Sequence, residues 1–593
     1  MGSQKKMKAI IDPSKKLISS DPVAMQRKCS AASRALNVAM PLALVGALIL
    51  VLSELDLSAV HPYMRSSSPT KANNFRWRVS PNEANRTIRT SGRSNGGDEL
   101  EWVQFPVIAN ETQLRLAQIE ANGTRRCHGV RTHTGLVEGL QPEAEGRPLR
   151  LVAGDIVEFR IVSVAEDGSR RCAGGDFYET DLSSEFWKSR PPVVDNGDGT
   201  YSARMQVDPR FAGLYTLRIS LLYANFHGMH LLVVDDLNPW MREDEVLVQE
   251  IEFVERPDAP RAQIRLDRCA EEDYDLKQWS GRWTRTEYNS ECDIDGAGRF
   301  LCLPPGTRCR EPWCQGPLDA LESNGWSYSA HCSFKLFTED EAWQCLDGKW
   351  LFWWGDSNNL DTARNLLNFV LGLDVGPKMA RGTDRDYVRP SNNSDPQQQQ
   401  QQSVRMSNIF NGHSDIIKNY QGLFALTSER FRAAMRAYFQ KDKSPDVMIM
   451  NSGLHDGCFW PSPMLYVQQG LQVAIEFWKS VLDGILPKSP RLVYRTTIAV
   501  GGKSRARGFN PHKMEWFNKF MVEKLQGTGL ANMRIVDGFD LTFPWHYDND
   551  HNDGAHYGKA PSNTTWVNGK IGHQYFVDLM LVHILLNAIC DSS

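Results

Sequence analysis

A candidate nucleophile occurs where a buried strand is expected to end and a helix to begin. Ser357 follows Gly355 and Asp356, directly after the apolar run 350–354. A serine at such a turn is presented at the C-terminal edge of a sheet, where the amides of the next helix can stabilise an oxyanion. Asp and Ser also cap helices well, so capping alone is the alternative interpretation. The local pattern favours catalysis.

A serine hydroxyl needs a general base, and that base needs an acceptor to orient it. The segment 546–558 interleaves three histidines with three aspartates, and Asp553 and His556, nearest the last predicted helix, are spaced as D-x-x-H. In a tight loop this spacing can bring the carboxylate against the imidazole and fix its tautomer. The same residue types also bind divalent metals, which is the less favoured alternative. We therefore expect a serine site without a metal.

An α/β pattern over 346–593 supplies the elements that must position these residues. Buried strands are predicted at 349–355, 445–453, 491–500 and 533–538, with helices at about 358–372 and 472–486. Alternating strands and helices predict a parallel sheet between two helical layers. The Gln-rich segment 391–403 has no capacity to bury a core, so it is predicted to be a disordered surface insert.

Short alternating runs separated by turn residues extend over 103–255 and predict a β-sandwich. The element D-x-G-D-G-T-Y at 195–201, with G-x-Y at 213–215, resembles the immunoglobulin-like filamin repeat. Such a domain either binds a ligand or glycan, or acts as a spacer that packs on the catalytic domain. We favour the spacer. The fold alone does not decide between the two roles.

Cysteines are concentrated between the two predicted domains. Of twelve in the chain, seven lie within 256–345: Cys269, Cys292, Cys302, Cys309, Cys314, Cys332 and Cys345. In an oxidising compartment this density predicts a disulfide-stapled connector, although its pairings stay open. Zinc is the alternative, but the Cys309/Cys314 gap is not C-x₂-C and no paired histidines accompany it.

The N-terminal residues suggest a membrane anchor. Residues 1–34 hold eight Lys/Arg and two acidic residues, and 35–53 is an uncharged, largely apolar segment. We predict a cytosolic tail, a transmembrane signal anchor over 35–53 and a flexible stem over 54–102, with a cleavable signal peptide as the alternative.

The net charge of −4 does not favour nucleic acid as a partner. Glycosylation sequons follow the segment 35–53 at Asn85, Asn110, Asn122, Asn392 and Asn563.

Gly355-Asp356-Ser357 together with the late Asp553-x-x-His556 resembles the SGNH/GDSL hydrolase superfamily and, more closely, its PC-esterase branch. The whole layout resembles the neurexophilin and PC-esterase (NXPE) family. The resemblance implies that Ser357 is the nucleophile, His556 the base and Asp553 its orienting residue.

The family's oxyanion donors are less well matched. The strand end 451–456 reads NSGLHD in place of G-x-N-D. Candidate donors are Ser357, Gly412 and Asn451, and candidate substrate contacts are His455 and Asp456.

The resemblance also implies a function. Related proteins of the secretory pathway transfer acetyl groups to sugar hydroxyls, and others hydrolyse such esters. We expect a carbohydrate O-acetyltransferase in a Golgi or other secretory membrane, of single-pass type II topology, acting on a glycan or glycoprotein. Acetyl-CoA is the expected donor, and no tightly bound cofactor is expected. A carbohydrate O-acetyl esterase is the first alternative, and a catalytically silent adhesion protein is the second.

Overall fold

The computed structural model describes residues 101–590 with internal gaps. The gaps are 122–129, 141–145, 231–236, 256–265, 277, 286–292, 295–299, 302–324, 374, 377–378, 391–400, 412–420, 442, 529, 531–532, 547–553 and 559–574. The predicted anchor at 35–53, the stem and most of the Gln-rich insert therefore lie outside the described residues, as do Asn85, Asn122, Asn392 and Asn563. Asn110 is described and exposed.

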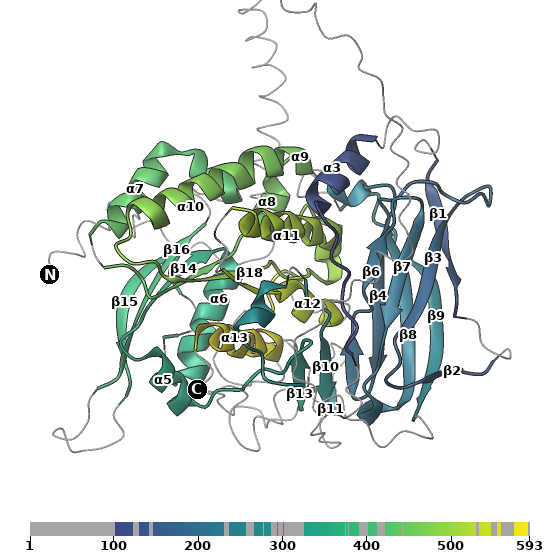
Figure 1. Cartoon of the computed structure of the whole chain (residues 1–593), viewed down its shortest axis with the longest axis horizontal. Helices are drawn as coiled ribbons and strands as arrows, with labels where there is room; N and C mark the ends of the chain where they lie inside the picture. Colours follow the sequence, from purple (N-terminus) through teal and green to yellow (C-terminus); the bar gives the residue numbers. More distant parts are fainter. Residues whose placement is uncertain are drawn as a thin grey trace, which may run out of the picture.

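A six-stranded sheet forms the centre of the C-terminal half (Figure 1). In spatial order its strands are β15 (Gly382–Val388), β16 (Ser403–Phe410), β14 (Trp350–Gly355), β17 (Val447–Met450), β18 (Arg491–Arg495) and β19 (Arg534–Val536). Every residue of β14 is buried, because this strand has parallel neighbours on both sides and helices over both faces.

Helices cover this sheet in two layers (Figure 1). One layer holds α7 (Glu429–Phe439), α8 (Leu454–Phe459), α9 (Pro463–Leu465), α10 (Gln472–Gly484) and α11 (Pro511–Gln526). The other holds α5 (Glu339–Leu346), α6 (Ser357–Asn365), α12 (Gly538–Thr542) and α13 (Tyr575–Ile589).

Two further sheets face each other beside this region and share an apolar core. The smaller contains β1 (Thr132–Glu138), β3 (Val157–Ala165), β7 (Thr200–Met205) and β6 (Val193–Asp195). The larger contains β13 (Trp326–Ser329), β10 (Arg282–Arg285), β5 (Trp187–Ser189), β4 (Phe177–Ser184), β8 (Gly213–Tyr223), β9 (Asp244–Val254) and β2 (Leu149–Val152). The short β11 (Asp293–Ile294) and β12 (Phe300–Leu301) pair separately, and α3 (Glu111–Ala121) lies against α11.

The predicted fold class is wrong, because the sheets are mixed. In the six-stranded sheet β15 runs antiparallel to β16, and in the seven-stranded sheet β2 runs parallel to β9 among antiparallel neighbours. The pair β15 and β16 is a hairpin around the Gln-rich insert. The sequence pattern concealed β15, since charged residues such as Asp384 and Arg385 are uncommon in strands and only one face of this edge strand is covered.

The predicted membrane-spanning helix is also without support. None of the helices in the described part of the chain combines the length and apolar character needed to cross a bilayer. The fold class is therefore corrected to several mixed sheets with packed helices.

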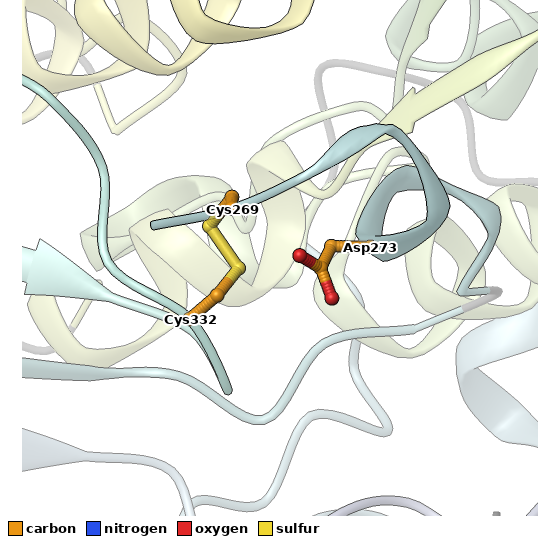
Figure 2. Close-up of side chains that lie close together, drawn as sticks. All are labelled: Cys269, Asp273 and Cys332. Carbon is orange, nitrogen blue, oxygen red and sulfur yellow. A yellow bond between two sulfur atoms is a disulfide. The ribbon is translucent and has the colours of Figure 1, made fainter. Parts of the chain in front are cut away.

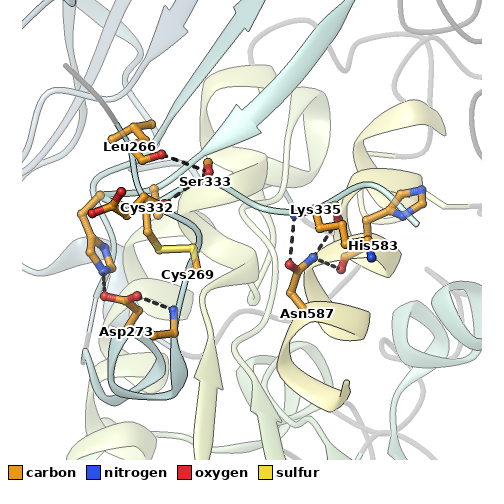
Figure 3. The surroundings of a disulfide bond; sticks show 12 residues. Leu266, Cys269, Asp273, Cys332, Ser333, Lys335, His583 and Asn587 are labelled. Carbon is orange, nitrogen blue, oxygen red and sulfur yellow. Dashed lines mark hydrogen bonds and ion pairs between the residues drawn. A yellow bond between two sulfur atoms is a disulfide. The ribbon is translucent and has the colours of Figure 1, made fainter. Parts of the chain in front are cut away.

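The cysteine-rich segment is bound into the fold at both ends. Cys269 and Cys332 form a disulfide, and Cys345 of α5 is joined to Cys590 across 245 residues. Figure 3 shows how the segment following Cys332 is held on α13: the amide of Lys335 donates to Asn587 Oδ1 at 2.9 Å, and Asn587 Nδ2 donates back to the carbonyl of Lys335. Since β10 also pairs with β5, this segment is joined to the sandwich by backbone hydrogen bonds and to α13 by Asn587.

Candidate active site

The turn that carries Ser357 is built by close packing between a strand end and a helix. β14 ends at Gly355 and α6 begins at Ser357. A Cβ atom on Gly355 would lie 2.6 Å from Asn359 Cβ, so a glycine lets the helix approach the strand this closely. Asp356 caps the helix, and its Oδ1 accepts from the amides of Asn358 and Asn359 at 3.0 and 3.4 Å.

This cap does not use the amide of Ser357, which belongs to the first turn of α6, where amides have no intrahelical acceptor. Within 351–360, Ser357 is the only residue that is not fully buried. Its side chain can therefore meet a ligand while its neighbours hold the turn.

His556 lies beside Ser357 in the structure. The Oγ atom of Ser357 is 2.7 Å from Nε2 of His556, and it is the one side-chain hydrogen bond of Ser357 to a described residue. His556 is 8% exposed. This separation is within the reach that a general base needs to take the hydroxyl proton. Residues 199 positions apart thus meet at the carboxyl edge of the sheet.

The loop carrying His556 is fixed by α6 itself. Asn358 Nδ2 donates to the carbonyl of Ala555 at 2.9 Å, and Arg364 and Asn365 donate to the carbonyl of Gly558. The helix that carries Ser357 therefore also holds the segment on both sides of His556. The sequence analysis missed these residues. The available signal was a run of polar residues in a helix that directly follows a wholly apolar strand.

The opposite side of the same loop rests on the segment after β18. Gly554 has φ +73°, and a Cβ atom there would lie 2.3 Å from the carbonyl oxygen of Gly501. Its own carbonyl accepts from the amide of Gly501 at 2.8 Å, and Tyr557 Oη donates to the carbonyl of Ala499 at 2.8 Å. The backbone around His556 is thus bound on two sides.

A buried carboxyl group supports α6 from α13. Asp578 accepts from Thr362 Oγ1 at 2.7 Å and from Asn365 Nδ2. Burial raises the pKa of Asp578 to about 6, although the hydrogen bond from Thr362 and the charge of Arg495 oppose this shift. The carboxyl group therefore orients two side chains of α6, the helix that begins at Ser357.

The remaining predicted site residues have mixed outcomes. Asp553 and Gly412 lie outside the described residues, so their roles stay predictions. Asn451 is fully buried, and its Nδ2 donates to the carbonyl of Arg495 at 2.9 Å. At most one of its amide hydrogens is left for an oxyanion. The amide of Ser357 is therefore the donor candidate with the simplest geometry.

His455 and Asp456 follow β17 and are both buried. The ring of His455 contacts Phe410 edge to face, with centroids 5.2 Å apart. Asp456 accepts from the amide of Leu423 at 2.8 Å, from Trp460 Nε1 at 2.9 Å and from Ser452 Oγ. Burial raises the pKa of Asp456 to about 6 against these hydrogen bonds. With hydrogen bonds to both oxygens, Asp456 organises the loop, and substrate contacts of His455 and Asp456 stay predictions.

The structure describes two histidines of the metal alternative, and both have other contacts: His556 with Ser357, and His546 with the sandwich. His546 is fully buried, and its Nε2 lies 2.9 Å from Glu179 Oε1 of β4. A separate grouping of potential ligands contains Cys269, Asp273 and Cys332 (Figure 2). Both of its sulfur atoms are joined in a disulfide, and Asp273 Oδ1 is bound by His331 at 2.7 Å. This grouping therefore offers no thiolate pair to a metal.

Comparisons with known proteins give no further evidence on what this site does. The sequence matches no known protein family, and it has no match among curated proteins. Among solved structures, the chain is similar to Axe2, an acetylxylan esterase from Geobacillus stearothermophilus. The match covers 41% of this chain and 95% of that chain, at 12% identity and a TM-score of 0.23. A likeness this slight carries no argument about activity.

Proposed function

We propose that this protein cleaves or transfers acyl esters of carbohydrates through an acyl-enzyme on Ser357. The observation that supports the proposal most is the 2.7 Å separation between Ser357 Oγ and His556 Nε2 at a strand–helix junction. Its physical basis is that a serine hydroxyl becomes nucleophilic only when a positioned base takes its proton.

The proposed reaction has two halves. Ser357 Oγ attacks the ester carbonyl carbon while its proton passes to His556 Nε2, and the amide of Ser357 donates to the developing oxyanion. The bond from the carbonyl carbon to the leaving oxygen, or to sulfur when acetyl-CoA is the donor, then breaks, and the leaving alcohol or thiol takes the proton from His556. In the second half, water or a sugar hydroxyl attacks the acyl-serine, and His556 again accepts and returns the proton. Asp553 is proposed as the residue that orients His556.

The acyl acceptor decides between an esterase and a transferase. Carbohydrate as the substrate class rests on the resemblance of the two motifs to the PC-esterase branch. Disulfides at Cys269–Cys332 and Cys345–Cys590 favour an oxidising compartment, where glycans are made and modified.

The test uses the purified chain and two reactions, followed by mass spectrometry of the sugar. In one, a partially O-acetylated cello-oligosaccharide is supplied alone. In the other, the unacetylated oligosaccharide is supplied with acetyl-CoA. Loss of acetyl groups in the first identifies an esterase, and their gain in the second identifies a transferase. Either activity must be absent from Ser357→Ala and retained by Ser480→Ala, which removes an exposed hydroxyl from α10. Failure of both reactions would contradict the proposal.

A further inference from the structure

A cavity of 290 Å³ opens in the sandwich at residues that belong to neither the Ser357 turn nor the His556 loop. Its walls come from the start of β1, from the turn after β3, from the 3₁₀ helix η2 (His227–Met229) and from the segment leading to β9. Ligand pockets in proteins usually measure ~300–1,000 Å³, so the cavity lies at the size expected for a single small ring.

An aromatic platform forms one wall. The Trp240 ring is half-buried and stacks on His227, with centroids 5.0 Å apart and planes inclined by 28°. Burial, with the nearby His230 and Arg131, lowers the pKa of His227 to about 4. The imidazole is consequently neutral at pH 7, so the platform brings apolar surface and hydrogen-bonding groups without a charge.

Two oppositely charged side chains belong to the lining of the cavity. Arg131 and Glu166 line the cavity, are exposed, and form no ion pair with any residue in the described part of the chain. The other cation in the wall is already neutralised: Arg242 pairs with Asp244 and donates to the carbonyl of His133 at 2.7 Å. The cavity therefore combines one available donor group, one available acceptor group and little net charge.

The backbone around the cavity is held in unusual conformations. Asn225, Phe226 and Glu243 flank it with φ values of 53°, 61° and 57°. Residues other than glycine rarely adopt a positive φ. Those that do occur often at binding sites, where the surrounding packing holds them in place. Here Asn225 Oδ1 accepts from the amide of Thr132 at 3.1 Å, and the amide of Phe226 donates to the carbonyl of Gly175 at 2.6 Å.

The catalytic half supports the rear of the cavity. The amide of Asn238 donates to the carbonyl of Ala506 at 2.9 Å, and Lys513 Nζ donates to the carbonyl of His230 at 2.8 Å. Ala506 ends the 3₁₀ helix η8 (Gly502–Ala506), which starts next to Gly501, the partner of Gly554 in the His556 loop. The cavity is thus preformed on a rigid support.

From these observations we infer that the cavity binds a neutral pyranose residue of a glycan, with the ring on Trp240 and neighbouring hydroxyls shared between Arg131 and Glu166. Aromatic rings provide the flat apolar surface that a sugar face needs, and the paired donor and acceptor suit adjacent hydroxyls. Because the charges of Arg131 and Glu166 balance each other, the cavity favours a neutral sugar over a uronate. The inference does not depend on the chemistry proposed for Ser357.

The experiment titrates the full chain, carrying Ser357→Ala to prevent turnover, with cellobiose, xylobiose and galactobiose while saturation-transfer NMR and calorimetry are recorded. We expect at least one disaccharide to bind, with the same affinity in the presence of wild-type Ser357. Trp240→Ala should weaken binding tenfold or more, and Arg131→Gln and Glu166→Gln should each weaken it severalfold. Glucuronate should bind no better than the neutral sugars.

Two control variants show whether the effect belongs to the cavity. Phe186→Ala removes a 39%-exposed aromatic ring beyond the opposite end of β4, and Arg150→Gln removes an exposed guanidinium from β2. Both should bind as the parent does. Binding by none of the three disaccharides, or equal binding by the parent and Trp240→Ala, would overturn the inference. Because the parent already lacks Ser357, a catalytic failure cannot produce either result.

Discussion

Gly355 sets how closely the nucleophile's helix approaches the sheet. In Gly355→Ala the new Cβ would lie 2.5 Å from Asn359 Nδ2, so the start of α6 must shift. Overpacking of this kind costs about 1–3 kcal/mol. We expect a lower melting temperature and slower acylation of Ser357. Gly484→Ala is the control, since no atom lies within 4 Å of its added Cβ at the end of α10, and it should keep parental stability.

Asn358 is a positioning residue, because it acts on His556 through the carbonyl of Ala555. In Asn358→Asp the shape is kept, but the side chain can no longer donate. A hydrogen bond of about 1.4 kcal/mol corresponds to a tenfold change in rate. We expect kcat for p-nitrophenyl acetate to fall about tenfold with KM unchanged.

The melting temperature separates this role from simple unfolding. If Asn358→Asp lowers the melting temperature while kcat of the folded enzyme stays at the parental value, Asn358 supports the fold alone and the positioning role is wrong.

At the scale of elements, α12 anchors the connector through two neighbouring carboxyl groups. Asp540 Oδ2 accepts from Tyr328 Oη and from the amide of Gly281, both at 2.6 Å, and Asp537 Oδ2 accepts from the amide of Trp279 at 2.9 Å. Burial, with the charge of Asp537, raises the pKa of Asp540 to about 7.

This shift predicts a pH dependence of stability. An unfolded aspartate has a pKa of about 3.9, so between about pH 4 and pH 7 the folded chain holds a proton that the unfolded chain has released. The contribution of Asp540 to the free energy of unfolding therefore falls as pH rises through this window. We expect denaturant titrations at pH 5 and pH 7 to show a smaller difference for Asp540→Asn than for the parent. An equal difference in both proteins would contradict the assignment to Asp540.

The sequence predicted elements best where strands are wholly buried. The apolar run before Gly355 placed β14 and the start of α6 to within two residues. Strands β15, β10 and β13 were missed, because charged residues obscure the alternation in β15 and β10, and the partners of β10 and β13 are distant in sequence. The hydrogen bonds from Asn358 and Arg364 to the His556 loop could not be predicted either. A side-chain bond to a carbonyl almost 200 positions away leaves no local sequence pattern.

Across the whole molecule, a buried ion pair and a hydrogen bond join the sandwich to the half of the chain that carries Ser357. Glu179 of β4 is fully buried and lies 3.0 Å from Arg505 Nη2 and 2.9 Å from His546 Nε2. Although burial acts to raise the pKa of Glu179, the positive charge of Arg505 and the hydrogen bonds from His546 and Arg505 hold that pKa below its usual value. The two halves therefore share charges that neither could bury alone.

Breaking these contacts should be costly. Glu179→Gln leaves Arg505 buried without this carboxylate, and removal of one partner from a buried pair costs about 3–5 kcal/mol. We expect a large loss in the free energy of unfolding, measured by urea titration. Glu252→Gln removes the partner of Arg150 at the surface and should change stability little. Similar small losses in both variants would show that Glu179 does not hold the halves together.

The central claim is that His556 activates Ser357, and a fluorophosphonate probe tests it most directly. Labelling of the full chain is followed over time by intact mass, and the modified residue is found by peptide mapping. We predict a single adduct on Ser357, absent from Ser357→Ala, formed about a hundredfold or more slowly in His556→Ala, and unchanged in Ser480→Ala. An adduct on Ser357 that forms at the same rate without His556, or labelling that persists in Ser357→Ala, would contradict the account.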